Sequence, residues 1–391
     1  MKKAGHVVIV GAGITGAATA YFLARDGLLR DGGQVTVIEK DSVGSHASGF
    51  AFGGLIGMIE ASGPHGAPPT LSSLALRLNR ELATVIPAET GIDTNYRVKP
   101  SVMLAMSPAE VPGLLRTFEY LQRTGVAGEA RWLESRAEID GVEPRIAPGV
   151  AAALYADISA EVEPYKLTLA LAQAAEGRGV RIRHGVVSGL SLRRGRVDGV
   201  KIGDEAVEAD SVVIAAGPWT SEASNWTGIG ASISTLPISP LPIFPLKGQI
   251  LRLRAPGQPL KAMFWWGNDY ATTKPDGLVW AGTTEEHAGF DDTPTPEARD
   301  QIMASAISAF PYLEDARLVR QTACLRPVSS DGDPIVGFLP EVAGVVVATG
   351  AGRNGIMLGP ALGRLAADLV LGNDPSCDIR GLGPERFVRR T

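Results

Sequence analysis

The fold of this chain is decided near its start by the stretch Val7–Val8–Ile9–Val10–Gly11–Ala12–Gly13–Ile14–Thr15–Gly16. Its β-branched apolar residues predict a buried parallel strand. The glycines then follow at the spacing G-x-G-x-x-G, and residues 17–25 are typical of a helix. A second apolar strand is predicted over residues 35–38, and Glu39 follows it directly. This succession predicts a strand–helix–strand unit that binds a dinucleotide.

Each part of this unit has a physical task in holding a dinucleotide. Gly11 allows the tight turn after the strand, Gly13 lets the backbone approach a pyrophosphate, and Gly16 lets the helix lie close to the strand. The helix N-terminus offers N–H groups and a partial positive charge to the phosphates. Glu39 can accept hydrogen bonds from a ribose diol, and an acid here favours a free 2′-hydroxyl. The stretch therefore predicts FAD or NAD rather than NADP.

Two other interpretations of the same stretch have to be weighed. Glycine is common in this chain, at 47 of 391 residues, so the glycine spacing alone is weak. Met1–Lys2–Lys3 followed by an apolar run also imitates a secretory signal. The acid at the right distance, directly after a second predicted strand, favours the dinucleotide over both.

Composition limits the classes of function. With 391 residues the chain is long enough for two domains, each with its own core. A formal net charge of −5 gives no electrostatic footprint for nucleic acid or an anionic membrane. The two cysteines, Cys324 and Cys377, form no CxxC pair, and five scattered histidines form no metal-ligand spacing. We therefore expect a reducing compartment, a cytoplasmic location and no metal.

The rest of the chain alternates between the first unit and a second one. The glycine-rich residues 41–57 are expected to pack against a flat ligand, with a flexible loop as the alternative. Residues 71–86 and 166–176 have helical periodicity, and residues 190–209 predict an antiparallel meander. The later segments return to the first sheet or form the second unit. Strands are predicted at 179–183, 210–219, 247–254, 263–284 and 345–350. Helices are predicted at 296–310 and from 356, and residues 236–245 are a proline-rich extended segment.

Several later segments, taken together, resemble one family. They include Arg326–Pro327–Val328–Ser329–Ser330–Asp331–Gly332–Asp333–Pro334–Ile335–Val336–Gly337, a stretch far more specific than the glycine spacing, and Thr349 to Gly355. Further matches are Ser45–Gly54, 209–219, Lys247–Gly248–Gln249 and Gly282–Glu286. With the N-terminal stretch they resemble the D-amino-acid oxidase superfamily of FAD enzymes, in its glycine oxidase, sarcosine oxidase and D-amino-acid dehydrogenase branch.

This resemblance implies an α/β plus α+β fold, in which a Rossmann-like FAD-binding domain carries a smaller antiparallel-sheet substrate domain. The FAD-binding domain is expected over residues 1–85, 150–224 and 323–391, and the substrate domain over 86–149 and 225–322. The expected FAD-binding residues are Gly11, Gly13, Ile14, Thr15, Gly16, Glu39, Lys40, Ser48, Gly53, Gly54, Val187, Ala216, Gly217, Trp219, Gly352, Arg353, Asn354, Gly355 and Ile356.

The resemblance also implies three catalytic residues. Arg326 matches the arginine that holds the substrate carboxylate, and a guanidinium fork suits that task because it gives two parallel charge-assisted hydrogen bonds. A structural ion pair is the alternative. Tyr270 matches a tyrosine that contacts the same carboxylate, with simple packing as the alternative. Arg353 matches an arginine beside the flavin ring and the substrate pocket.

Three other features are expected to be structural. Cys324 precedes Leu325–Arg326–Pro327, where one branch carries a cysteine bonded to the flavin, but the residues after it follow the non-covalent branch. We therefore expect a buried, inert thiol. Phe264–Trp265–Trp266 is expected in the core or at an interface rather than in the pocket, and His46 is expected to be a polar residue with a partner.

The function implied is FAD-dependent oxidation of the C–N bond of a small amino acid or amine to the imine, with electrons passed to oxygen or another acceptor. Glycine, N-methyl, D- and cyclic imino acids all stay open as substrates. The alternative is a flavin-binding dehydrogenase subunit of a larger complex that delivers electrons to a quinone or a partner protein. A homo-oligomer is left open, and no nucleic-acid partner is expected.

Overall fold

A computed structural model describes residues 5–56, 69–124, 129–226, 241–340 and 342–387. Its first sheet has six strands in the order β19-β20-β13-β1-β2-β9. All neighbours in this sheet are parallel except β19, which runs antiparallel to β20. The strands are β1 (His6–Val10), β2 (Gln34–Glu39), β9 (Arg181–His184), β13 (Ser211–Ile214), β19 (Ile335–Phe338) and β20 (Val345–Thr349).

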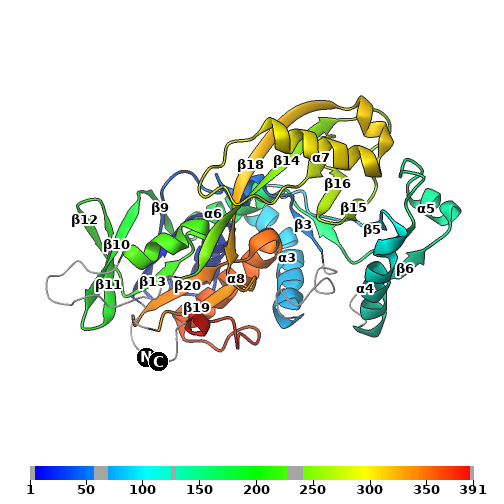
Figure 1. The fold of residues 1–391 in the computed structure, drawn as a ribbon. Coiled ribbons are helices and arrows are strands. Elements are labelled where there is room, and N and C mark those ends of the chain that lie inside the picture. Colours follow the sequence, from blue (N-terminus) through cyan, green and yellow to red (C-terminus); the bar gives the residue numbers. More distant parts are fainter. Residues whose placement is uncertain (1–4, 57–68, 125–128, 227–240, 341, 388–391) are drawn as a thin grey trace.

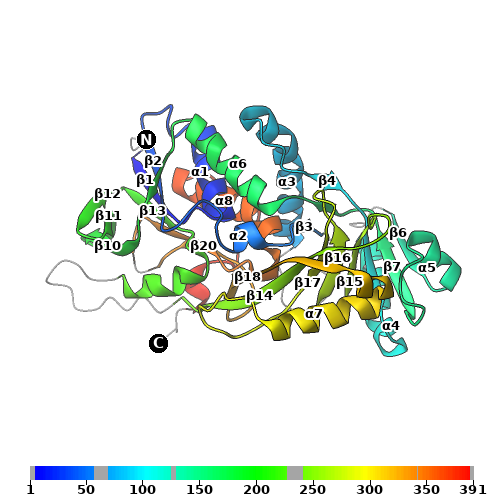
Figure 2. The same ribbon diagram turned by 90° about the horizontal axis from the view of Figure 1, so that it is seen from above.

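The two faces of this sheet are covered by different elements. Along β1, Val7 and Ile9 point into a core shared with the helices, whereas Val8 and Val10 point into a core on the opposite face. The helices on the first face are α1 (Ile14–Arg25), α3 (Pro69–Thr90), α6 (Pro164–Gly177) and α8 (Gly355–Leu371). The second face is covered by an antiparallel meander of β10 (Val187–Arg193), β11 (Arg196–Ile202) and β12 (Glu205–Glu208). Figures 1 and 2 show the helices grouped together and this meander projecting at one end.

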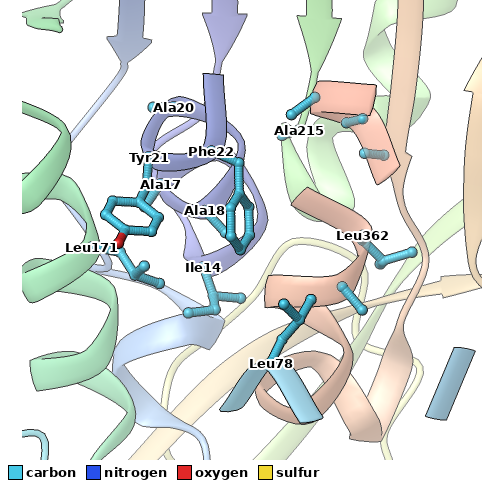
Figure 3. Close-up of a cluster of buried hydrophobic side chains, with 14 of the residues drawn as sticks. Ile14, Ala17, Ala18, Ala20, Tyr21, Phe22, Leu78, Leu171, Ala215 and Leu362 are labelled. Carbon is cyan, nitrogen blue, oxygen red and sulfur yellow. The ribbon is translucent and has the colours of Figure 1, made fainter. Parts of the chain in front are cut away.

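Helix α1 lies between α6 and α8 and makes the centre of the helical core. Figure 3 shows its side chains between Leu171 of α6 and Leu362 of α8. Tyr21 and Phe22 have no exposed surface, and burial of each such ring contributes roughly 1.5–3 kcal/mol relative to leaving it in water. This packing fixes the N-terminus of α1 against the end of β1.

The second sheet has eight strands in the order β18-β14-β17-β16-β15-β5-β7-β6. Its pairs are antiparallel apart from β15 and β5. Helix α7 (Pro296–Ala309) covers one face and begins at Thr295, whose side chain accepts a hydrogen bond from the backbone N–H of Ala298. The strands are β5 (Ser101–Ala105), β6 (Ala130–Leu133), β7 (Ala152–Ala156), β14 (Ile243–Arg254), β15 (Met263–Trp266), β16 (Asp269–Thr273), β17 (Val279–Gly282) and β18 (Arg317–Ser329).

The two sheets are joined by long strands and by a small third sheet. Strands β14 and β18 pair from Ile243 opposite Ser329 to Arg254 opposite Arg317. They therefore extend from the core on the second face of the six-stranded sheet into the eight-stranded sheet (Figure 1). The third sheet has the order β3-β8-β4. The remaining elements are β3 (Gly54–Leu55), β4 (Arg97–Val98), β8 (Ala160–Glu161), α2 (Ala47–Phe50), α4 (Val111–Thr124), α5 (Arg136–Val142) and the 3-10 turns η2 (Pro108–Glu110), η3 (Gly217–Asn225), η4 (Pro311–Asp315), η5 (Gly352–Asn354) and η6 (Pro384–Phe387).

The structure differs from two of the expectations drawn from the sequence. The loop expected before Gly54 contains the short helix α2, and β3 follows it. Strands β7 and β18 lie in the eight-stranded sheet, although the proposed limits at residues 150 and 323 would place β7 and part of β18 with the FAD-binding domain. The division into two domains therefore stays a proposal. Residues 236–240 of the proline-rich segment lie outside the described residues.

Among the described residues, no helix has the length and apolar character that a membrane span requires.

Candidate active site

A cavity of about 740 Å³ opens at the carboxyl ends of the parallel strands and continues to the eight-stranded sheet. Ligands of open α/β sheets bind at this edge. All of the expected FAD-binding residues except Gly16 line this cavity, as do Arg326, Tyr270 and Arg353. The structure thus brings the expected cofactor and catalytic residues together, while their individual roles stay predictions.

The glycine turn after β1 has the geometry that the sequence motif requires. Gly11 has a φ of +102°, which disfavours any residue with a side chain. A Cβ on Gly16 would lie 1.9 Å from the carbonyl oxygen of Gly11, so Gly16 permits the close contact between α1 and the turn. Gly13 has an ordinary φ of −71° and lines the cavity, where a Cβ would contact Ser48 Oγ at 3.1 Å. Space for a ligand, rather than backbone strain, explains a glycine at position 13.

Glu39 is held in place at the end of β2. Its Oε2 accepts a hydrogen bond from the backbone N–H of Ala12 at 2.7 Å, and its Oε1 accepts one from the backbone N–H of Asp41 at 2.9 Å. The carboxylate is buried and lines the cavity. Each oxygen keeps a further lone pair, so this carboxylate can accept hydrogen bonds from a ribose diol.

The short helix α2 reaches the first turn of α1. Ser48 Oγ accepts a hydrogen bond from the backbone N–H of Ile14 at 3.0 Å. Gly13, Ile14 and Thr15 line the cavity, so the positive end of the α1 dipole faces it. This arrangement suits the phosphates of a dinucleotide.

A polar and aromatic cluster lies beside Glu39. Lys40 Nζ lies 4.0 Å from the ring centroid of Trp219, and the His46 and Trp219 ring centroids are 4.7 Å apart. His46 Nε2 lies 2.6 Å from Asp41 Oδ2, and hydrogen bonds from Lys40 and His46 hold the pKa of the Asp41 carboxyl below its usual range. His46 therefore has the partner that we expected. Of the histidines in the described part of the chain, His46 alone lines the cavity, far along the chain from Arg326.

Arg326 lies on β18 at the other end of the cavity. Its Nη2 donates a hydrogen bond to Thr283 Oγ1 at 2.6 Å, and its Nη1 donates one to the carbonyl oxygen of Thr284 at 3.1 Å. Both acceptors are neutral. Because guanidinium carries five N–H donors, three remain for a ligand. This geometry differs from the structural ion pair that was the alternative.

The guanidinium of Arg326 lies flat against the backbone of Gly248 on β14. The register places Gly248 opposite Cys324 and Lys247 opposite Leu325, so Gly248 is a near neighbour of Arg326 on the adjacent strand. A Cβ on Gly248 would lie between 2.1 and 2.5 Å from three guanidinium atoms. Glycine at 248 therefore provides the space in which the Arg326 side chain lies.

An aromatic wall closes the same end of the cavity. The ring centroids of Phe52 and Tyr270 are 4.0 Å apart, and that of Trp265 lies 5.2 Å from each of them. All three line the cavity, whereas Phe264 and Trp266 are buried on the opposite face against Phe310. Our expectation for residues 264–266 is therefore correct for the outer two and wrong for Trp265. The reason is the period of two along β15, which points neighbours to opposite faces.

Tyr270 is buried, and its hydroxyl stays protonated at neutral pH. Burial raises the pKa of Tyr270 far above its usual value, although Arg326 and Arg353 both oppose this shift. Its hydroxyl can therefore act as a hydrogen-bond donor. Arg326 is bonded to Thr283 and Thr284, and Arg353 is bonded to the carbonyl oxygen of Asn268, two residues before Tyr270.

Arg353 precedes α8 and also lines the cavity. Its Nη1 donates to Glu285 Oε1 at 2.8 Å, and its Nη2 donates to the carbonyl oxygen of Asn268 at 2.6 Å. Glu285 and Asn268 line the cavity as well. Arg353 is thus bound to a carboxylate, unlike Arg326.

Cys324 is buried but also lines the cavity. Burial raises the pKa of its thiol, so the thiol is protonated at neutral pH. The inert thiol that we expected here stays a prediction. Among the described residues, no group of three or more histidine, cysteine or acidic side chains is arranged to hold a metal ion.

The cavity residues suit FAD at one end and a small anion at the other. The turn at Gly11, the space at Gly13 and the fixed carboxylate of Glu39 match the pyrophosphate and ribose of a dinucleotide. The turn from Gly352 to Gly355 and the start of α8 line the cavity nearer to Arg326. The residues present therefore fit this cofactor.

The sequence did not single out Trp265, Thr283 and Glu285 as cavity residues, whereas Phe52 lies within residues 41–57, which were expected to pack against a ligand. Trp265 could have been found, because Trp266 and Asp269 enclose a two-residue hairpin loop of Gly267 and Asn268, a known turn pattern. That loop puts Trp265 directly opposite Tyr270 on one face. No such pattern indicated Thr283 and Glu285, because their position depends on how the chain that follows β17 lies against Arg326 of β18, with β14 between the two strands.

Comparison with known proteins gives the family. Residues 6–369 match the DAO family of FAD-dependent oxidoreductases. A glycine oxidase of Pseudomonas putida is 32% identical over 385 residues, which cover 97% of this chain and 98% of that protein. This chain belongs to the DAO family, and it is an FAD-dependent oxidoreductase.

Solved structures agree with this family. The crystal structure of glycine oxidase from Geobacillus kaustophilus has a TM-score of 0.87 and 29% identity, covering 98% of this chain and 99% of that one. An iminodiacetate oxidase from Chelativorans sp. BNC1 has a TM-score of 0.84 and 26% identity, covering 97% and 98%. The expected fold class and the FAD cofactor are confirmed.

Proposed function

We propose that this enzyme oxidises the C–N bond of a small α-amino acid or N-substituted glycine to the imine. The observation that carries the proposal is the Arg326 guanidinium, which two neutral oxygens hold in the cavity with N–H donors to spare. The oxidases named above support it, since glycine and iminodiacetate both carry a carboxylate next to an amine. The enzyme would thus hold the carboxylate and oxidise the adjacent carbon.

Each residue of the inner cavity has a defined task in this proposal. Arg326 binds the substrate carboxylate through two parallel hydrogen bonds, and the Tyr270 hydroxyl donates another. Phe52 and Trp265 exclude water from the reacting carbon. Bound FAD supplies the acceptor for the two electrons and the hydrogen of the C–H bond. The residues that would hold its ring system include Gly352, Arg353 and those that follow.

The proposal requires no side-chain base. His46 is engaged by Asp41 and Trp219 in the cluster beside Glu39. A substrate that binds with a neutral amine needs only correct position, which is a large part of catalysis in itself. We therefore expect kcat/KM to rise with pH until the free substrate amine is fully deprotonated.

Anaerobic mixing tests the substrate class. The FAD-loaded protein is mixed with glycine, N-methyl amino acids, D-amino acids and cyclic imino acids, and bleaching of the flavin absorbance is followed. We expect at least one of these groups to bleach it rapidly, and Arg326→Ala to abolish that reaction while the flavin stays bound. If none of them bleaches the flavin, the proposal fails.

We further propose that oxygen is the electron acceptor, because the full-length relatives named above are oxidases. Admission of air to the reduced enzyme should then give one hydrogen peroxide per flavin. Rapid reduction with negligible peroxide would instead favour the dehydrogenase subunit that delivers electrons to a quinone or partner protein. A cytoplasmic location belongs to this proposal as well.

A further inference from the structure

The ion pair between Glu285 and Arg353 lies in the wall of the cavity that contains Arg326. Glu285 follows β17 in the eight-stranded sheet, and Arg353 precedes α8, so the pair connects two distant parts of the chain. The two side chains have exposed fractions of 35% and 31%. Both line the cavity, so they are open to it and to solvent.

The charged side chains at the Arg326 end of the cavity can bind one carboxylate. Glu285 directly follows Thr284, whose carbonyl oxygen accepts a hydrogen bond from Arg326, and Asn268, which accepts one from Arg353, lies two residues before Tyr270. Arg353 is already neutralised, because Glu285 accepts one of its hydrogen bonds and the carbonyl oxygen of Asn268 accepts another. Arg326 donates to the neutral oxygens of Thr283 and Thr284, so its charge remains for the ligand.

We propose that Glu285 determines how many carboxylates a substrate can carry. While Glu285 holds Arg353, a second carboxylate on the substrate meets an already paired guanidinium and the negative charge of Glu285. Removal of that charge leaves Arg353 free to bind a second carboxylate. The inference rests on the proposed function in one respect, namely that Arg326 binds the first carboxylate.

The exposure of the ion pair indicates that Glu285 contributes little to the free energy of folding. Pairs that are partly exposed to water contribute little to folding, commonly below about 1 kcal/mol. The second bond of Arg353, to Asn268, does not involve Glu285 and can keep the guanidinium in place. Glu285→Gln should therefore fold and bind FAD, so that its effect is on the ligand.

The test compares a monocarboxylate with a dicarboxylate. FAD-loaded wild type, Glu285→Gln and the control Glu297→Gln are titrated with acetate and with malonate, and binding is followed by the change in flavin absorbance. Glu297 is an exposed carboxylate in the first turn of α7, so its loss removes the same charge outside the cavity. The ratio of the two Kd values is the readout, because general loosening of the site would change both alike.

We expect Glu285→Gln to shift this ratio roughly tenfold in favour of malonate, as one released charge-assisted pair allows. Glu297→Gln should leave the ratio unchanged. The double variant Glu285→Gln/Arg353→Met should return it to the wild-type value, because the second binding group is then lost. For turnover, kcat/KM for iminodiacetate relative to N-methylglycine should shift in the same direction.

An unchanged ratio in Glu285→Gln overturns the inference, and so does failure of both anions to bind. These outcomes are separate from failure of the proposed function. If no amino acid reduces the flavin but the malonate ratio shifts, the proposed reaction is wrong and the role of Glu285 stands. If amino acids reduce the flavin but the ratio stays constant, the reaction stands and the role of Glu285 is wrong.

Discussion

The two ends of the cavity are built in opposite ways. The end at Gly11 comes largely from the first 54 residues, and it presents backbone groups, small side chains and one fixed carboxylate. The end at Arg326 comes from five strands of the eight-stranded sheet and presents large rings and charged side chains. One end is thus defined by a local motif, and the other by which strands lie side by side. Substitutions at the two ends should therefore impair different properties of the enzyme.

The largest effect is expected for Arg326→Ala. Loss of two charge-assisted hydrogen bonds to a carboxylate costs about 3–6 kcal/mol, so kcat/KM should fall roughly 150- to 25,000-fold. The FAD content should not change, since Arg326 lies at the other end of the cavity from Glu39. Stopped-flow reduction and flavin absorbance measure the two quantities. An equal loss for a simple amine without a carboxylate would contradict the assigned task.

At the nucleotide end, Gly13→Ala and Gly16→Ala form a matched pair. Gly13 has an ordinary φ and only Ser48 near its missing Cβ, so Gly13→Ala should leave the apoprotein stable. Its FAD affinity should fall about tenfold or more, because the new methyl group occupies the approach to the pyrophosphate. Gly16→Ala creates a contact with the Gly11 carbonyl and should instead destabilise the apoprotein by roughly 1–3 kcal/mol.

Thermal unfolding of the apoprotein and titration with FAD separate these two results. If Gly13→Ala lowers the Tm of the apoprotein as much as Gly16→Ala does, position 13 is structural. Neither variant, once saturated with FAD, should change the KM for substrate. The unchanged KM would show that the two ends of the cavity act independently.

The same contrast explains what the sequence could predict. The turn at Gly11, the place of Glu39 and the β13 and β20 strands follow from local patterns, and the structure has them where they were expected. The family resemblance supplied Arg326, Tyr270 and Arg353. The position of Trp265 follows from the local hairpin of β15 and β16. The positions of Thr283 and Glu285 depend on how β14, β17 and β18, which are far apart in the chain, lie side by side, and no pattern within a single strand fixes that arrangement.

Thr283→Val should have a smaller effect at the substrate end. It removes the hydroxyl that accepts from Arg326 Nη2 and that donates to the carbonyl oxygen of Gln249 at 3.0 Å. Arg326 then keeps its charge but loses part of its orientation, so KM should rise about tenfold with little change in kcat. Thr283→Ser keeps the hydroxyl and should restore KM. A rise in KM that serine does not restore would indicate a packing effect.

A buried ionic cluster lies next to Phe52 of the aromatic wall. Glu161 on β8 lies close to Arg97, Lys99 and Lys274, and Lys274 Nζ lies 5.1 Å from the ring centroid of Phe52. Glu161, Lys99 and Lys274 are almost fully buried. Three cations around one carboxylate leave excess positive charge in a region of low dielectric.

The last expected effect concerns the pH dependence of stability and leaves the activity aside. Burial is the main cause that lowers the pKa of Lys99 from 10.5 to about 8, and Arg97 and Lys274 add to it. Between these two pH values the unfolded chain binds a proton at Lys99 that the folded chain has released. The free energy of unfolding should therefore rise with pH across this window, by at most about 1.4 kcal/mol per pH unit from this group. Denaturant unfolding of wild type and Lys99→Met, at fixed excess FAD, measures the difference. That difference should grow from pH 8 to pH 10 and be flat below pH 7, and a flat difference throughout would mean that Lys99 keeps its proton in the folded state.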